Sequence, residues 1–356
     1  MNRIYMKTNE KYGAYEAPRV GGTTIKKLLV ITWMAALTAL AGCQQDDEPH
    51  ADPIPYVTFS ASGEQTMLIH KPESLSVEIF CSVNDGDWED VADKEYSITF
   101  GGAHGDLRLR ATSEIGTSTD DGNYKISFEN ETPVACTGDI RTLVDWENYA
   151  TANTGNAKFY QLFRGCTQLT SAPELPATTL AESCYYMMFR GCTQLATAPE
   201  LPATALSQNC YAMMFYGCTS LTSAPALPAT ALTPSCYNMM FRGCTQLTSA
   251  PELPATNLAN NCYDMMFHGC TSLTTAPVLP ATTLAEACYQ HMFNGCTNLN
   301  SITMLATDIS ASNCLSYWVN GVAATGTFYK NPAATWTVTG ASGIPAGWTA
   351  QNYTAP

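Results

Sequence analysis

Cysteine is the residue type whose number and spacing in this chain could support chemistry. Twelve of the 15 cysteines fall into two series, which alternate along the chain with a long gap and then a shorter one. Zinc-binding motifs usually bring two cysteines within two to four residues, so this spacing argues against a metal site. Disulfides and buried free thiols both fit the pattern, and we favour free thiols because the positions are apolar and inward. The first series is Cys166, Cys192, Cys218, Cys244, Cys270 and Cys296, and the second is Cys184, Cys210, Cys236, Cys262, Cys288 and Cys314.

Other catalytic residue types form no recognisable arrangement. The five histidines are scattered, and no Ser-His-Asp ordering or glycine-rich phosphate loop is found. Asp85, Asp87, Glu89 and Asp90 lack the spacing and closing glutamate of an EF-hand, so we interpret them as a turn. His291 stands where other copies of the repeat carry methionine, which indicates a half-exposed position rather than a catalytic one. We therefore expect a protein that is not an enzyme and holds no cofactor or metal.

The cysteines belong to a repeat of constant length. The motif Phe-x-Gly-Cys recurs with a strict 26-residue period from Phe163 to Phe293, without insertion or deletion. A fixed period of this size indicates stacked units that contact only their neighbours, which is a solenoid. We expect about six coils over residues 149–322, followed by a hairpin-like C-terminal β cap over residues 323–356.

One coil illustrates the expected fold. Leu195–Ala198 is predicted to be a short strand, and Pro199 and Pro202 end it and turn the chain. Apolar residues step by four through Ser207–Phe215, which predicts a helix, and Gly217 occupies the place of a helix C-cap. These elements together predict an α/β solenoid with a parallel strand ladder.

The segment Met214–Pro225, which reads Met-Phe-Tyr-Gly-Cys-Thr-Ser-Leu-Thr-Ser-Ala-Pro, resembles the repeats of BspA-like leucine-rich-repeat surface proteins. The resemblance covers roughly Phe159–Val322. It implies an extracellular protein, lipid-anchored or secreted, that binds host or microbial partners. The Pro-x-Leu-Pro-Ala-Thr segment and the second cysteine of each coil depart from that pattern, and they leave the ligand open.

The N-terminus has the layout of an export signal. Two lysines precede an apolar run over Leu28–Ala41, which is too short to span a membrane. Leu-Ala-Gly-Cys at its end resembles a bacterial lipobox, which implies cleavage before Cys43 and lipidation of its thiol. We expect residues 1–43 to be the signal peptide, with an over-long start, and residues 44–55 to be an acidic, proline-containing tether. The acidic run Gln44–Glu48 resembles a surface-export signal, although a solvated linker explains it equally well.

Between the tether and the repeats, residues 56–148 alternate apolar and polar side chains in short runs. Such runs separated by turn residues predict a small all-β, sandwich-like domain. Its predicted strands include Tyr56–Phe59, Leu75–Phe80, Tyr96–Phe100, Leu107–Arg110 and Tyr124–Phe128. Residues 44–150 contain 22 acidic and 6 basic residues, so this part of the chain would be repelled by nucleic acid and by anionic membranes.

Two rows of repeat positions are candidates for partner binding. The strand face carries threonines at Thr170, Thr222, Thr248 and Thr274, and it is small and neutral. The residue after each motif phenylalanine varies most between copies, and arginine and tyrosine are frequent at interface hot spots. The variation is also explained if these positions form a solvent-exposed edge, where the residue type is free to change between copies. This variable row consists of Arg164, Arg190, Tyr216, Arg242, His268 and Asn294.

We expect a lipoprotein of the outer membrane, exposed at the cell surface or facing the periplasm, whose repeats bind a protein partner in adhesion. The alternatives are a glycan-binding accessory lipoprotein of a nutrient-uptake system, with the β domain as the carbohydrate module, and a structural spacer. Aromatic side chains grouped on the surface of Tyr56–Phe128 would favour glycan binding.

Replacing Cys43 with alanine tests the anchor. Because lipidation needs the thiol, Cys43→Ala is expected to release the mature protein from membrane fractions, as judged by fractionation and labelling with a palmitate analogue. Continued membrane association together with label incorporation would contradict the assignment.

Overall fold

The computed structural model describes residues 56–119 and 122–354. The predicted signal peptide, lipidation site and tether lie outside these residues. Within the described part, no helix is long and apolar enough to cross a membrane.

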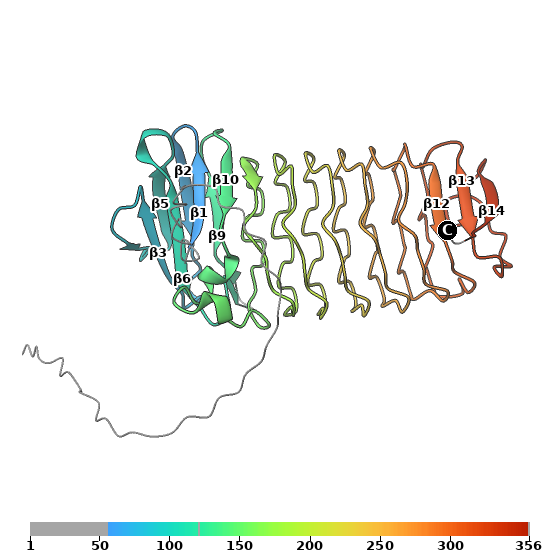
Figure 1. The fold of residues 1–356 in the computed structure, drawn as a ribbon, viewed down its shortest axis with the longest axis horizontal. Coiled ribbons are helices and arrows are strands. Elements are labelled where there is room, and N and C mark those ends of the chain that lie inside the picture. Colours follow the sequence, from blue (N-terminus) through green and yellow to red (C-terminus); the bar gives the residue numbers. More distant parts are fainter. Residues whose placement is uncertain (1–55, 120–121, 355–356) are drawn as a thin grey trace, which may run out of the picture. The chain divides into compact units, whose positions relative to one another are not determined.

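The β domain forms two main sheets (Figure 1). Strand order in the larger sheet is β11-β10-β1-β6-β3-β4, in which β11 (Leu169–Ser171) comes from the first coil of the repeats, and in the smaller sheet it is β5-β2-β9. β7 and β8 pair separately. The strands of this domain are β1 (Val57–Ala61), β2 (Gln65–His70), β3 (Glu78–Val83), β4 (Glu89–Asp90), β5 (Glu95–Phe100), β6 (Leu107–Thr112), β7 (Ser118–Thr119), β8 (Gly122–Asn123), β9 (Lys125–Phe128) and β10 (Val134–Thr137).

Alternating burial along the strands explains why these sequences form sheets. Val57 and Phe59 in β1, and Met67 and Ile69 in β2, are fully buried, while the residues between them are half-exposed. The ring of Phe59 lies 6.2 Å from that of Phe128 on β9, so the two sheets share one core. The predicted β domain is therefore present, although β2, β4, β7, β8 and β10 were not among its predicted strands. Glu89 and Asp90, which were interpreted as part of a turn, pair with β3 as β4.

The β domain covers the first coil of the repeats. β10 pairs in parallel with β11 (Leu169–Ser171), and the amide of Ile126 donates to the carbonyl of Leu162. The Phe59 ring also lies 6.2 Å from that of Phe163, the first phenylalanine of the repeat motif. An open stack of coils would expose its core and its strand edge. The β domain covers both at the first coil.

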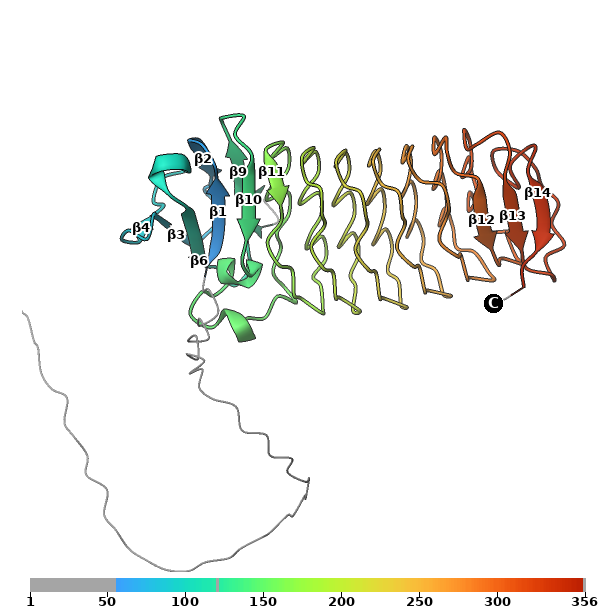
Figure 2. The same ribbon diagram turned by 45° about the horizontal axis from the view of Figure 1, so that its top comes forward.

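The repeats form a solenoid whose coils lie side by side (Figures 1 and 2). Parallel bridges join equivalent positions of successive coils, such as Thr197 with Ser223 and Ser223 with Ser249. The predicted short strand Leu195–Ala198 is reduced to the single bridge of Thr197. Longer strands occur only at the two ends of the stack, within the described residues.

The helix predicted over Ser207–Phe215 is wrong, and with it the α component of the fold class. This segment is a run of overlapping turns, in which Cys210 donates to Ser207, Ala212 to Asn209, and Met214 to Tyr211. The described residues contain only three short 3-10 helices, which are η1 (Gly102–His104), η2 (Ile140–Leu143) and η3 (Tyr149–Thr151).

Every second amide of this segment donates to a carbonyl of the next coil, and not to one within its own coil. Tyr211, Met213 and Phe215 donate to carbonyls of the next coil, at Cys236, Asn238 and Met240, over 2.8–3.0 Å. Every fourth residue of the segment has positive φ, as at Asn209 (56°), Met213 (56°) and Gly217 (74°). The turn hydrogen bonds and a positive φ at the third turn residue are features of type II turns, and they interrupt a helix.

Stacked aromatic rings fill the coil interior. Phe189, Phe215 and Phe241 are fully buried, and adjacent rings lie 5.7 Å apart with nearly parallel planes. A second stack contains Tyr185, Tyr211, Tyr237, Tyr263 and Tyr289, at spacings of 5.7–6.0 Å. Each coil therefore buries the same residue types against its neighbours, as a strictly constant period requires.

The C-terminal segment continues the coil stack. β12 (Ser301–Met304), β13 (Thr327–Lys330) and β14 (Thr349–Asn352) pair in parallel, so the hairpin expected here is not formed. Trp318 ends the phenylalanine stack, with its ring 6.2 Å from those of Phe293 and Phe328. Its indole N–H donates to the carbonyl of Gly343 over 2.9 Å, so the buried ring leaves no unpaired donor.

A pair of glycine substitutions distinguishes turns from a helix. Asn209→Gly is expected to be neutral or to stabilise the protein by up to about 1 kcal/mol, because glycine adopts positive φ without strain. The neighbouring exposed residue serves as control, and Gln208→Gly is expected to cost about 0.5–1 kcal/mol. Urea unfolding of both variants measures the difference, and equal losses would indicate a helix.

Candidate functional site

Both cysteine series are buried, and all their members are free thiols. In the first series each thiol from Cys192 onward donates to a phenylalanine carbonyl of the preceding coil, whereas Cys166 donates to the carbonyl of Ile126 in the β domain. The Sγ of Cys218 lies 3.1 Å from the oxygen of Phe189, and the Sγ of Cys244 lies 3.1 Å from that of Phe215. These thiols thus add a hydrogen bond between coils at the turn where the chain passes Gly217.

Burial also suppresses the chemistry of the thiols. It raises the pKa of Cys244 to about 12 and that of Cys218 well above its ordinary value. Nucleophilic attack and metal binding need the thiolate, which is therefore scarce at neutral pH. No group of three or more histidine, cysteine or acidic residues that could hold a metal ion occurs among residues 56–119 and 122–354.

The variable row lies along one line of the solenoid. Successive members occupy equivalent positions, and from Arg190 onward their carbonyls accept hydrogen bonds from glycine amides of the preceding coil. Gly191 donates to Tyr216, and Gly217 donates to Arg242, each over 2.8 Å. Arg164 is exposed, whereas the other five members are half-buried. Backbone pairing therefore holds these side chains at the spacing of the coils.

At the centre of the row, two arginine side chains lie against the ring of Tyr216. The guanidinium carbons of Arg190 and Arg242 lie 4.7 and 5.4 Å from the centre of the Tyr216 ring. Nη1 of Arg242 also lies 3.2 Å from the sulfur of Met265. Cation–π contacts contribute about 0.5–1 kcal/mol at exposed sites, so they restrain the side chains of the two arginines.

Two histidines, one in the variable row and one outside it, have perturbed pKa values. Burial, and then the charge of Arg242, lower the pKa of His268 and of His291, which favours their neutral forms. The half-exposed His291 stacks on Tyr317 at 5.6 Å, in the place that methionine takes in other coils. No catalytic partner for it is found among the described residues.

Asp264 is a buried carboxylate that the sequence did not single out. Its Oδ2 accepts a hydrogen bond from the amide of Asn238 over 3.0 Å, while Oδ1 is buried without a partner. Burial raises its pKa to about 6, although the Asn238 hydrogen bond and the charge of Arg242 act in the opposite direction. Comparison of the repeat copies could have singled it out, because the equivalent residues of the two preceding coils are the uncharged Ala212 and Asn238.

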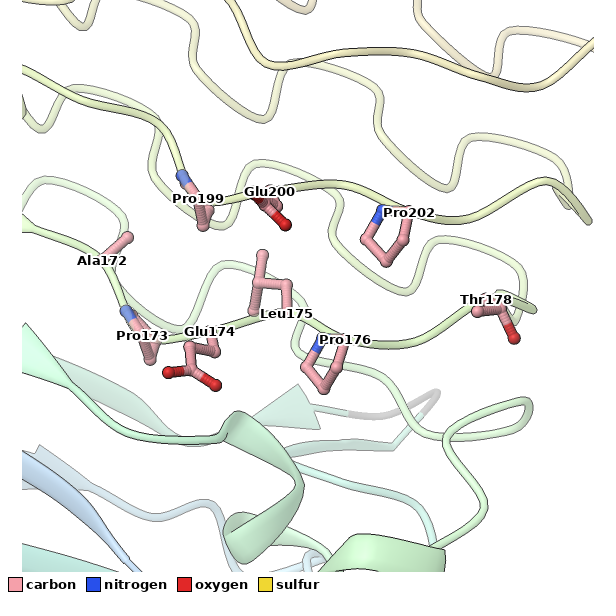
Figure 3. A pocket seen from close by; sticks show the side chains of 9 residues that line it. All are labelled: Ala172, Pro173, Glu174, Leu175, Pro176, Thr178, Pro199, Glu200 and Pro202. Carbon is pink, nitrogen blue, oxygen red and sulfur yellow. The ribbon is translucent and has the colours of Figure 1, made fainter. Parts of the chain in front are cut away.

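Beside the threonine face lies a hollow that the sequence did not predict. We call it the proline trough, and its walls are pairs of prolines from successive coils, Pro173 with Pro176, Pro199 with Pro202, and Pro225 with Pro228. Its first section has a volume of about 430 Å³, and its second has about 350 Å³. Figure 3 shows the first section, with the Leu175 side chain directed toward the next coil. The Pro-x-Leu-Pro motif was visible in the sequence, but the space between its copies was not.

Aromatic side chains cluster on the outer face of the β domain. The Arg110 guanidinium lies between the rings of Trp88 and Trp146, 3.9 and 3.6 Å from their centres. The Tyr56 and Trp88 rings are 5.8 Å apart, and Arg108 lies 4.8 Å from the Tyr56 ring centre. Trp146 comes from the loop after η2, so the tertiary structure completes the group.

Comparison with protein-family models, with curated proteins and with solved structures gives no match. The chain itself defines its class, which is a repeat solenoid of constant period behind an N-terminal β-sheet domain.

The titration of Asp264 predicts a pH dependence of stability. The unfolded side chain titrates near pH 3.9, so between about pH 4 and pH 6 the folded protein holds a proton that the unfolded chain has lost. The free energy of unfolding contributed by this group therefore falls as pH rises through that window.

Asp264→Asn is expected to flatten this dependence and to stabilise the protein at pH 8 by about 1–2 kcal/mol. Urea unfolding from pH 4 to pH 8 measures it, with the exposed Glu252→Gln as control. A variant that follows the wild-type profile would contradict the assignment.

Proposed function

We propose that this chain is a cell-surface lipoprotein whose solenoid presents a rigid platform to a protein partner, in adhesion. The variable row is its binding surface. The observation that carries the proposal is the stack of Arg190, Tyr216 and Arg242, in which hot-spot residue types are held on a rigid backbone ladder.

Rigidity favours affinity because binding then orders fewer side chains. Immobilising a flexible side chain at an interface costs roughly 0.5–1.5 kcal/mol, and the arginines of the row already have contacts. The carbonyls behind them are paired to the preceding coil, so the row retains its spacing when a partner docks.

The assignment to leucine-rich-repeat proteins of BspA type rests on the repeat motif around Met214–Leu221. The lipobox-like sequence ending at Cys43 supports an anchor in the outer membrane. The solenoid is consistent with this resemblance, although its coils use turns where a helix was expected.

Glycan binding by the β domain is the second candidate. The cluster of Tyr56, Trp88 and Trp146 is the surface grouping of aromatic rings that this alternative calls for. The arginines occupy part of these rings, since Arg110 covers one side of each tryptophan. We therefore rank this function below partner binding.

A triple substitution tests the variable row. Partners are first recovered with the soluble ectodomain from host-matrix and bacterial lysates. Replacing Arg164, Arg190 and Arg242 by alanine is expected to weaken their binding by more than about 2 kcal/mol, because the charges and the stacking are both lost. Surface plasmon resonance measures the affinity, and thermal melting verifies the fold.

The matched control replaces Thr222, Thr248 and Thr274 by alanine on the threonine face, and it should keep the wild-type affinity. Unchanged affinity in the arginine variant would contradict the proposal. If Trp88→Ala then abolished binding, the function would move to the β domain.

A further inference from the structure

The proline trough interrupts the hydrogen-bonded ladder between coils. No backbone hydrogen bond joins residues 172–177 to residues 198–203 in the described part of the chain. Pro199 and Pro202 have no N–H, and the amides of Glu200 and Leu201 have no partner there either. Near the end of the stack, where Ser301–Met304 replace the proline segment, the ladder resumes through Ala276 and Leu279.

These unpaired groups suit an extended chain. Backbone N–H and C=O groups that lie without partners are satisfied by water or by a ligand. An extended peptide supplies donors and acceptors along its length and places apolar side chains at intervals, as in other modes of peptide recognition. The trough offers an apolar wall of prolines and a leucine at the base of each section, Leu175 in the first and Leu201 in the second, which are 2% and 3% exposed.

The trough also carries negative charge without internal compensation. Glu174 and Glu200 line its first section (Figure 3), and both are exposed. Neither carboxylate has an ion-pair partner among the described residues, where Arg141 is paired with Asp139. Later coils lack such a pair, because Glu252 has Ala226 and Val278 at the equivalent positions on either side.

We propose that the first section of the proline trough docks an extended segment of a partner protein that carries a lysine or arginine among apolar residues. The basic side chain lies between the Glu174 and Glu200 carboxylates. The apolar residues contact the proline walls, and the peptide backbone pairs with the amides left free at Glu200 and Leu201. This site is separate from the variable row and does not rest on it.

Peptide selection tests the docking site directly. The full-length chain is panned against a phage-displayed library of random peptides, and enriched sequences are synthesised with a fluorescent label. We expect enrichment of peptides with a basic residue flanked by apolar ones. Fluorescence anisotropy is expected to show affinity falling about five- to tenfold in the double variant Glu174→Gln, Glu200→Gln, and falling with added salt.

Matched variants separate this site from the other surfaces. Glu252→Gln alters the same repeat position in a coil without a second carboxylate, and it should leave the affinity unchanged. The triple arginine variant of the variable row should also bind the peptides normally. The proposal is overturned if selection yields no basic consensus, or if the double glutamate variant, folded by thermal melting, binds the peptides as tightly as wild type.

Discussion

The hydrogen bonds between successive coils are the constraint on which the solenoid depends. In the turn segment, alternate amides bond within the coil and to the next coil, as Met214 does to Tyr211 and Phe215 does to Met240. Every second peptide group is thereby committed to a neighbour at a fixed offset. A single inserted residue would move each amide to the wrong partner, which explains why the period is constant from Phe163 to Phe293.

The same constraint determines what the interior contains. Equivalent residues must lie above one another, so rings stack on rings and thiols lie beside thiols. Phenylalanine planes in adjacent coils are nearly parallel, and the first-series cysteines add hydrogen bonds to the carbonyls between them. The raised pKa values of these thiols follow from that burial, and they make the cysteines structural rather than reactive.

Surface properties arise where the repeat is imperfect. The backbone repeats from coil to coil, so equivalent residues lie in a line along the solenoid. A change of residue type in one coil therefore changes the surface at one point of that line. Tyr216 between Arg190 and Arg242 forms a stack, and Asp264 between Asn238 and Gln290 becomes a buried carboxylate. Where prolines remove amides from the ladder, the proline trough lies between successive coils. The surface features of this protein thus arise from departures from a regular framework.

The sequence alone determined the period, the inward residues and the β domain. A strict spacing leaves no other way to bury Phe215 and Cys218 in every coil, and alternation along Lys125–Phe128 requires a strand. It also placed the variable row on one line. The choice between helix and turn was beyond it, because apolar residues stepping by four suit both. Only the partner of each amide separates them, and that partner lies in another coil.

The tertiary structure decided which polar groups meet. Trp146 joins Trp88 through Arg110 across a long stretch of chain, and the empty space between proline segments depends on how closely the coils approach. Local sequence specifies the face on which a side chain lies. Burial of Asp264, the placement of Glu174 and Glu200 along one trough and the unpaired amides of the trough depend on how the coils pack against one another.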